Sequence, residues 1–256
     1  MTVFSLKLLA LLLMLLDHVY LFFSDILPVP LWFTWAGRLS APLFFFCMAQ
    51  GMEHTRNPVR YLLRLYTSSL LMGGGNLLLP ALFPGGGELS NNIFSTLFLG
   101  ALLISLMGLS AADPRWGAGA GALLLFLFFA SWTACACLPP SAGRVVSLLL
   151  PTPFSVEGGA MFAALGPLFY FFRNDPRRRA GAYLLFSLCF FTQPLLLTLQ
   201  GTPWQSAFLE LSYQWMMVFA LPLLLCFDGR PGPSAKGLFY SFYPLHIWAF
   251  FLLSRR

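Results

Sequence analysis

The stretch "LLALLLMLLDHVYLFF", residues 8–23, is an apolar run that an acid and an imidazole interrupt at one point, Asp17 and His18. With the apolar residues before it, the run reaches the length of about 20 residues that a helix needs to cross the hydrocarbon core of a bilayer. An ionisable side chain is stable at that depth only where it faces protein or water. The stretch therefore predicts a membrane-spanning helix whose two polar residues point into a protein interior.

The composition extends this prediction to the whole chain. Of 256 residues, 58% are apolar and 9% are charged, and the mean hydropathy is +0.76. This number of charged residues is too small to cover the surface of a water-soluble protein. The protein surface is therefore expected to face the lipid bilayer. This excludes a soluble protein, and no nucleic-acid partner is expected.

Nine apolar segments are long enough to cross a membrane, and the connections between them are too short for a soluble domain. We therefore expect an all-α, polytopic transmembrane helical bundle that forms a single integral membrane domain over residues 1–256. Prolines at positions 42, 167, 194, 222 and 244 fall inside spans and predict kinks. The expected spans are roughly 3–23, 31–52, 59–79, 92–111, 117–137, 155–172, 180–200, 208–227 and 237–254.

Lysine and arginine residues set the expected orientation, because cations beside membrane spans stay in the cytoplasm. One side of the nine spans carries Lys7, Arg56, Arg60, Arg64, Arg115, Arg173, Arg177, Arg178, Arg179, Arg230 and Lys236, and the other side carries only Arg144, Arg255 and Arg256. We expect the N-terminus in the cytoplasm, the C-terminus outside, and the protein as a multi-pass component of the inner (plasma) membrane.

Ionisable residues inside the spans are the candidate functional residues. In the predicted orientation Asp17, His18 and Arg38 lie at similar depth, Asn92 opens a span on the same side, and His246 lies within the last span. We expect these residues to converge on one polar pocket. A neutral imidazole can act as a general base, and a guanidinium can stabilise a developing oxyanion, so the set suits acyl transfer to an amine or a hydroxyl.

A structural role for the same residues is the alternative. Neighbours on a helix point about 100° apart, so Asp17 cannot easily orient the imidazole of His18, and an Asp17–Arg38 ion pair would explain both charges. Glu157, at the outer start of a span, either lines an entrance or is solvated. The five cysteines and three histidines show no spacing typical of metal ligands, so no metal site is expected.

Five segments together resemble the TraX family, membrane proteins that are associated with N-terminal acetylation of conjugative pilin and are similar in layout to other membrane acetyltransferases. They are "LKLLALLLMLLDH" (6–18), "WAGRLSAPLFFFCMAQGMEHTRN" (35–57), "YLLRL" (61–65), "NIFSTLFLG" (92–100) and "FYSFYPLHI" (239–247). Between residues 101 and 235 the resemblance rests mainly on "EGGAMFAALGPLFYFFRND" (157–175), where the family commonly has an aromatic residue in place of Gly158.

The resemblance implies a transmembrane acetyltransferase with acetyl-CoA as co-substrate and a protein or glycan acceptor, either a pilin N-terminal amine or an envelope glycan. It marks Asp17, His18, Arg38 and His246 as catalytic, with His18 favoured over His246 as the base. Asn92, Tyr243 and Glu157 are the expected acceptor-binding residues.

The donor is expected to bind at the cytoplasmic rim. Arg56, Arg60 and Arg64 recur every four residues, so Arg56 and Arg64 can hold CoA phosphates there if their helix starts early enough. The alternative is that these cations only fix the orientation and contact anionic lipid.

Two other classes of function are compatible with the sequence. The first is a transporter or channel in which Asp17, Arg38 and His246 line a proton or substrate path. The second is a non-catalytic membrane assembly protein in which polar residues hold helices together.

Overall fold

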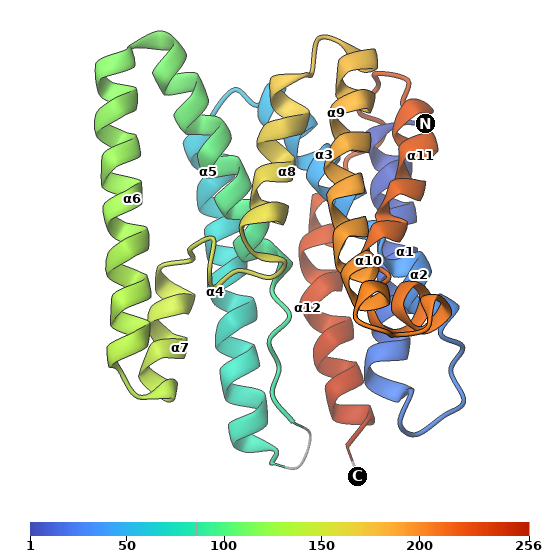
Figure 1. The fold of residues 1–256 in the computed structure, drawn as a ribbon. Helices are drawn as coiled ribbons and strands as arrows, with labels where there is room; N and C mark the ends of the chain where they lie inside the picture. The colour runs from blue at the N-terminus through green and yellow to red at the C-terminus, as the bar shows by residue number, and fades with distance from the viewer. Residues whose placement is uncertain (85–86, 256) are drawn as a thin grey trace. The chain divides into compact units, whose positions relative to one another are not determined.

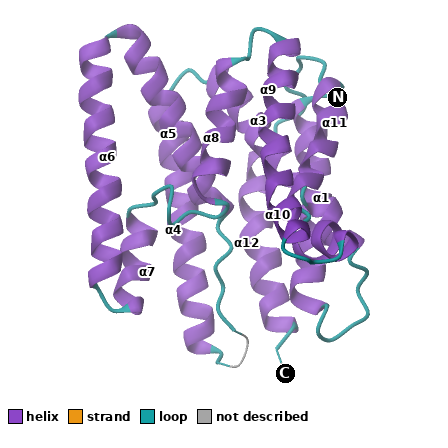
Figure 2. Cartoon of the chain, viewed as in Figure 1, coloured by secondary structure: helices purple, strands orange, loops and turns teal. Residues whose placement is uncertain are grey.

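The chain is helical throughout in the computed structural model, which describes residues 1–84 and 87–255 (Figures 1 and 2). Helix accounts for 77% of the structure and the described residues contain no strand, which confirms the all-α prediction. The chain divides into two compact units, Met1–Cys47 with Phe171–Arg256 (unit 1) and Met48–Tyr170 (unit 2). The single domain over residues 1–256 stays a prediction, and Arg256 lies outside the described residues.

Unit 1 is built from both ends of the chain. Its α-helices are α1 (Val3–Phe23), α2 (Trp32–Gly37), the first part of α3 (Ser40–Glu53), α9 (Pro176–Leu188), α10 (Thr192–Leu199), α11 (Leu221–Leu225) and α12 (Lys236–Leu253). Three shorter helical segments complete it: the 3₁₀ turns Cys189–Phe191 and Gln214–Ala220 and the π-helix Ser206–Leu211. The side chain of Thr2 accepts a hydrogen bond from the backbone N–H of Ser5, which is an N-cap, so α1 begins where the apolar run does.

Helices α1 and α12 are parallel neighbours, although 212 residues of chain, 24–235, lie between them. Near the start of both helices, the rings of Phe4 and Phe239 meet edge to face with centroids 6.1 Å apart. Near their other ends, Phe23 and Phe250 do the same at 5.2 Å. The two helices therefore run in one direction, with both of their N-termini at the same end of unit 1.

Two of the cations expected in the cytoplasm lie at this end. The carbonyl oxygen of Arg230 accepts a hydrogen bond from the N–H of Val3. The guanidinium of Arg179 lies over the ring of Phe46, which itself packs on Phe227. The predicted orientation requires both cations to lie at one end of unit 1, as they do. Which side of the membrane this end faces stays a prediction.

The second expected span, 31–52, is wrong as a single helix, because the chain turns at residues 38–39 between α2 and α3. Pro42 lacks an N–H and disfavours helical conformation in the residue before it, so it fits the first turn of α3 better than the interior of a long helix. Arg38 thus lies in a helix break. Pro194 and Pro222 likewise stand in the first turns of α10 and α11, whereas Pro167 and Pro244 lie inside α8 and α12.

The expected span 208–227 is also not one α-helix. The π-helix Ser206–Leu211, the 3₁₀ segment Gln214–Ala220 and α11 follow one another there. The span 180–200 forms as α9 and α10 with a single 3₁₀ turn between them. The apolar pattern located these segments, but it could not predict their helix type.

Unit 2 contains the rest of α3 and five further helices, α4 (Pro58–Leu82), α5 (Ile93–Ala112), α6 (Pro114–Cys137), α7 (Pro140–Leu149) and α8 (Gly159–Phe171). The side chains of Asn57, Asn92 and Asp113 cap the N-termini of α4, α5 and α6, which fixes where these helices begin. Helix α7 was not predicted, because it is too short and too polar on one face to read as a span.

Helix α8 begins later than the expected residue 155. Gly158 and Gly159 have φ angles of 74° and 65°, in the left-handed region that glycine tolerates best. A Cβ on Gly158 would also lie 2.6 Å from the ring of Phe162. Both the backbone angles and the lack of space therefore favour glycine at position 158.

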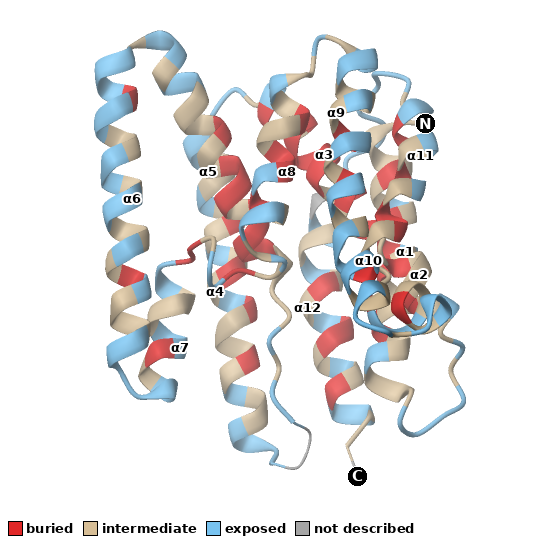
Figure 3. Ribbon diagram, in the orientation of Figure 1, coloured by how far each residue is buried: buried red, intermediate tan, exposed pale blue. Residues whose placement is uncertain are grey.

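Among the described residues, four helical stretches are long and apolar enough to cross a membrane: α1, α5, α6 and Pro176–Leu199. Shorter apolar helices cover Gly159–Phe171, Gln214–Leu225 and Gly237–Leu253. Outward-facing residues of α6 such as Leu125 and Phe126 are 69% and 67% exposed, whereas the buried residues lie inside the two units (Figure 3). These features are typical of a membrane protein, and the full set of nine spans stays a prediction.

Candidate active site

Helix α1 presents Asp17 to α2. The carboxylate forms an ion pair with the guanidinium of Arg38, and Thr34 donates its hydroxyl to Asp17 Oδ1 at 2.6 Å. The two charged side chains are only 19% and 24% exposed. The anticipated Asp17–Arg38 pair is therefore present, in the helix break where a long cationic side chain can reach back to α1.

Arg38 is held on several sides. Its Nε donates to the carbonyl oxygen of Thr34 at 3.1 Å, and its Nη1 donates to Gln214 Oε1 at 3.3 Å. The ring of Tyr213 lies 5.5 Å from the guanidinium carbon. Of the five N–H bonds of the guanidinium, one on Nη1 makes no hydrogen bond to a described residue and can donate to a substrate.

Gly37 makes the close approach of α1 and α2 possible. A Cβ at this position would overlap the Cβ of Asp17 and lie 2.8 Å from its Oδ1. The conformation of Gly37 is an ordinary helical one, so the requirement for glycine here comes from space and not from the backbone angles.

His18 points to α12 and not to its sequence neighbour. Its Nδ1 lies 2.7 Å from Nε2 of His246, and both imidazoles are buried, at 4% and 7% exposure. The pair explains why an acid and an imidazole are adjacent in the sequence: on one helix, consecutive side chains face two different neighbours, α2 and α12.

The hydrogen bonds assign the tautomers of the neutral pair. Nδ1 of His246 lies 2.8 Å from the carbonyl oxygen of Phe242, which can only accept, so this nitrogen carries the proton. Nε2 of His246 is then an acceptor, and His18 donates its Nδ1–H to it. The basic nitrogen of the pair is therefore Nε2 of His18.

Aromatic rings surround the pair. Tyr243 is 3% exposed and meets both imidazoles at centroid distances of 6.2 Å and 5.8 Å. Phe242 stacks on His246 at 5.0 Å, and Phe250 packs edge to face against the same imidazole. Tyr243, expected to bind the acceptor, thus forms a wall of the histidine site.

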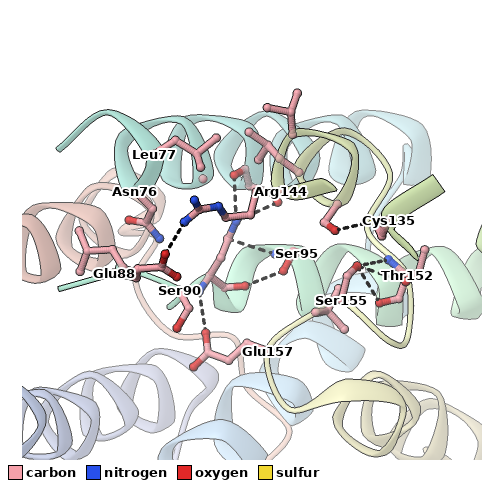
Figure 4. A pocket seen from close by; sticks show the side chains of 18 of the residues that line it. Asn76, Leu77, Glu88, Ser90, Ser95, Cys135, Arg144, Thr152, Ser155 and Glu157 are labelled. Carbon is pink, nitrogen blue, oxygen red and sulfur yellow. Dashed lines mark hydrogen bonds and ion pairs between the residues drawn. The ribbon is translucent and has the colours of Figure 1, made fainter. Parts of the chain in front are cut away.

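A separate cavity of about 840 Å³ lies within unit 2 (Figure 4). Two predicted acceptor-binding residues, Asn92 and Glu157, line it and contact each other: the backbone N–H of Asn92 donates to Glu157 Oε2 at 2.7 Å. The side chain of Asn92 also donates to the carbonyl oxygen of Ser69 at 3.0 Å, and Thr96 donates to the carbonyl oxygen of Glu157 at 2.8 Å. Asn92 and Glu157 therefore make these contacts within unit 2, while Asp17, His18, Arg38, Tyr243 and His246 gather in unit 1.

The expected donor site lies at the start of α4. Because α4 begins at Pro58, Arg56 precedes the helix, and only Arg60 and Arg64 are stacked one turn apart. This corrects the three-residue stripe, which required an earlier start. Arg56 and Arg60 are exposed, and Arg64 lies over the ring of Tyr61 at 5.5 Å.

Arg64 fits a phosphate ligand on one further observation. Its Nε is buried and has no hydrogen-bond partner among the described residues. A buried guanidinium N–H without a protein acceptor costs free energy unless a ligand or water supplies one, and phosphate oxygens suit the geometry of this group.

Three residues that contact the Asp17–Arg38 pair were not predicted from the sequence: Thr34, Gln214 and Tyr213. Thr34 stands four residues before Arg38, so helical spacing alone places both on one face. Gln214 is an amide side chain in an apolar segment, and this feature of the sequence could have identified it as a buried polar contact. Within the described residues, no group of three or more His, Cys, Asp or Glu side chains is placed to hold a metal ion.

Comparison with known proteins gives one match. The family model described as TraX protein matches residues 4–254. No curated protein and no solved structure matches the chain.

Proposed function

Because this chain belongs to the TraX family, we propose that it is a membrane-bound acetyltransferase of the inner (plasma) membrane. In this proposal it takes an acetyl group from cytoplasmic acetyl-CoA and transfers it to an amine or a hydroxyl. The family suggests a role in modifying pilin for conjugation, so a pilin N-terminal amine and an envelope glycan are the two acceptors to test.

The observation that carries the proposal is the buried His18–His246 pair. His18 donates a hydrogen bond to His246, and His246 donates one to the carbonyl oxygen of Phe242. Nε2 of His18 is then left as the proton acceptor. General-base catalysis of this kind contributes typically about 10²- to 10⁴-fold to a rate. In the proposed reaction, His18 Nε2 takes the proton of the acceptor amine or hydroxyl as this group attacks the thioester carbonyl carbon, and His246 holds the imidazole of His18 in the required tautomer. The C–S bond of the thioester then breaks, and the proton on His18 passes to the CoA thiolate that leaves.

Asp17 and Arg38 support the same site. The remaining Nη1–H of Arg38 can donate to the oxygen that becomes negative during acyl transfer, and Asp17 keeps the guanidinium in place. Acetyl-CoA supplies the activated thioester when it binds, and Arg64 is the residue best suited to one of its phosphates.

The test uses detergent-purified protein with radiolabelled acetyl-CoA and either pilin or an envelope extract from the same cells. We expect label on an acceptor, and we expect His18→Ala and His246→Ala to reduce labelling about 10²-fold or more. His54→Ala is the matched control, since His54 is exposed and bonds only to the backbone oxygen of Gln50.

Two outcomes would contradict the proposal. If folded His18→Ala and His246→Ala variants both keep near-normal transfer, the histidine pair is not the base. If the wild type leaves no label on any product, a transporter or an assembly protein takes the place of the enzyme.

A further inference from the structure

The cavity of unit 2 has a lining that is unusual for a chain this apolar. Ten of its twenty-four lining residues carry a neutral hydroxyl or amide side chain. They are Ser69, Asn76, Ser90, Asn92, Ser95, Ser131, Ser141, Ser147, Thr152 and Ser155. A cavity of this size that carries polar side chains on mostly apolar walls is typical of a ligand site, for which volumes of roughly 300–1,000 Å³ are usual.

The polar groups come from every wall. Helix α7 contributes Ser141, Arg144, Val145 and Leu148, spaced so that they share one helix face. Helix α4, which packs against α7, contributes Ser69 and Asn76, both buried. Several of these groups already bond within unit 2: Ser95 and Ser131, for example, donate to backbone oxygens. A hydroxyl that donates one hydrogen bond still keeps lone pairs, so it can accept from the hydroxyl groups of a ligand.

The charged groups of the cavity already have partners. Arg144 Nη1 donates to Glu88 Oε1 at 2.7 Å, and Glu157 Oε2 accepts from the backbone N–H of Asn92, as Figure 4 shows. An anionic ligand would have to displace Glu88 from the one arginine among the lining residues. The balance of charge therefore favours a neutral ligand.

Trp132 completes the lining with a large apolar face. Its side chain is 52% exposed and lies on α6, one turn before Cys135, which also lines the cavity. The C–H face of a sugar ring packs against an indole, while its hydroxyl groups bond to polar side chains on the other walls. Hydroxyls and amides on the other walls, paired charges and one exposed indole together match this chemistry.

We propose that this cavity binds a neutral sugar, with Trp132 as the stacking platform and the hydroxyl and amide side chains of α4 and α7 as hydrogen-bond partners. This proposal goes beyond the proposed function, because it stands on the lining of the cavity alone. In the predicted orientation Glu88, Arg144 and Glu157 all lie on the outer side, so the cavity would receive its ligand from outside.

The test measures binding without acetyl-CoA, so that its result is independent of the transfer reaction. The probe is the disaccharide of N-acetylglucosamine, added to purified protein in an amine oxide detergent, because maltoside and glucoside headgroups would compete. Saturation-transfer NMR or calorimetry should show saturable binding. Trp132→Ala should weaken it by about threefold to tenfold, the loss of one aromatic contact.

Trp116→Ala is the matched control, because Trp116 is on the same helix and 72% exposed but does not line the cavity. Ser141→Trp, at an exposed position in the lining, should block binding by filling the cavity without disturbing the buried residues. Equal effects of the two tryptophan variants, or no saturable binding of the disaccharide, would overturn the proposal. Trp132-dependent binding of a short peptide with a free N-terminal amine, or of inorganic phosphate, in place of the disaccharide would also overturn it.

Discussion

Gly37→Ala should separate Asp17 from Arg38 and destabilise unit 1. The new Cβ would overlap the Cβ of Asp17, an atom fixed to the backbone of α1, so rotation of the side chain cannot fully relieve the clash. Pushing the helices apart costs about 1–3 kcal/mol, the usual range for overpacking. Turning the carboxylate away leaves Arg38 without its partner, which costs about 3–5 kcal/mol for a fully buried pair and less for this one.

We therefore expect a loss of about 2–4 kcal/mol, which corresponds to roughly 5–15 °C in unfolding temperature. The measurement is thermal unfolding in detergent, followed by the helix signal in circular dichroism. Gly181→Ala is the control, because no atom lies within 4 Å of a Cβ built at this position in α9, and alanine there should raise stability slightly.

A double-mutant cycle makes the test specific. If the clash acts through the Cβ of Asp17, then Asp17→Gly, which removes that atom, should cost much less in the Gly37→Ala background than in the wild type. Additive losses, or a Gly37→Ala variant as stable as Gly181→Ala, would refute the reasoning.

Three further predictions concern donor binding, orientation and pH. Arg64→Gln should raise the KM for acetyl-CoA well beyond the effect of Arg177→Gln, and similar small effects in both would leave the cations of α4 with a topological role only. A reporter near Glu88 should be external, whereas residues 177–179 should resist an impermeant reagent added to intact cells; labelling there would reverse the orientation. Hydrogen bonds from the exposed Arg230 lower the pKa of Asp228 from its ordinary value of 3.8, so this carboxylate stabilises the fold above that pH and loses the contribution as the pH falls through the folded-state pKa. Asp228→Asn should therefore lower the unfolding temperature near neutral pH and not in strong acid, and equal shifts at both pH values would contradict this account.

The long helices could be predicted from sequence because their signals are local. An apolar run fixes α1, and an N-cap side chain directly before the first helical residue fixes the starts of α5 and α6. Two features could not be predicted in this way: the break at residues 38–39 and the short helix α7. Each depends on the partner against which the segment packs.

The site shows the same division between local and long-range information. Polar residues in apolar segments identified Asp17, His18, Arg38 and His246, since the cost of burying them is a property of each residue alone. Their pairing is a property of the fold: Asp17 and His18 are adjacent on α1 yet bond to α2 and α12. Which histidine carries the basic nitrogen depended on a bond to the carbonyl oxygen of Phe242, which no sequence pattern reports.

The separation of His18 and His246 along the chain also sets when the site can form during synthesis. The two residues are 228 positions apart, and at typical elongation rates of about 5–20 residues per second the second imidazole follows the first by roughly 10–50 s. Until then α1 lies in the membrane with a polar seam that α12 does not yet cover. Unit 1 can therefore close its histidine pair only after α12 has been made, so a chain interrupted before α12 contains Asp17, His18 and Arg38 but cannot form the pair of imidazoles.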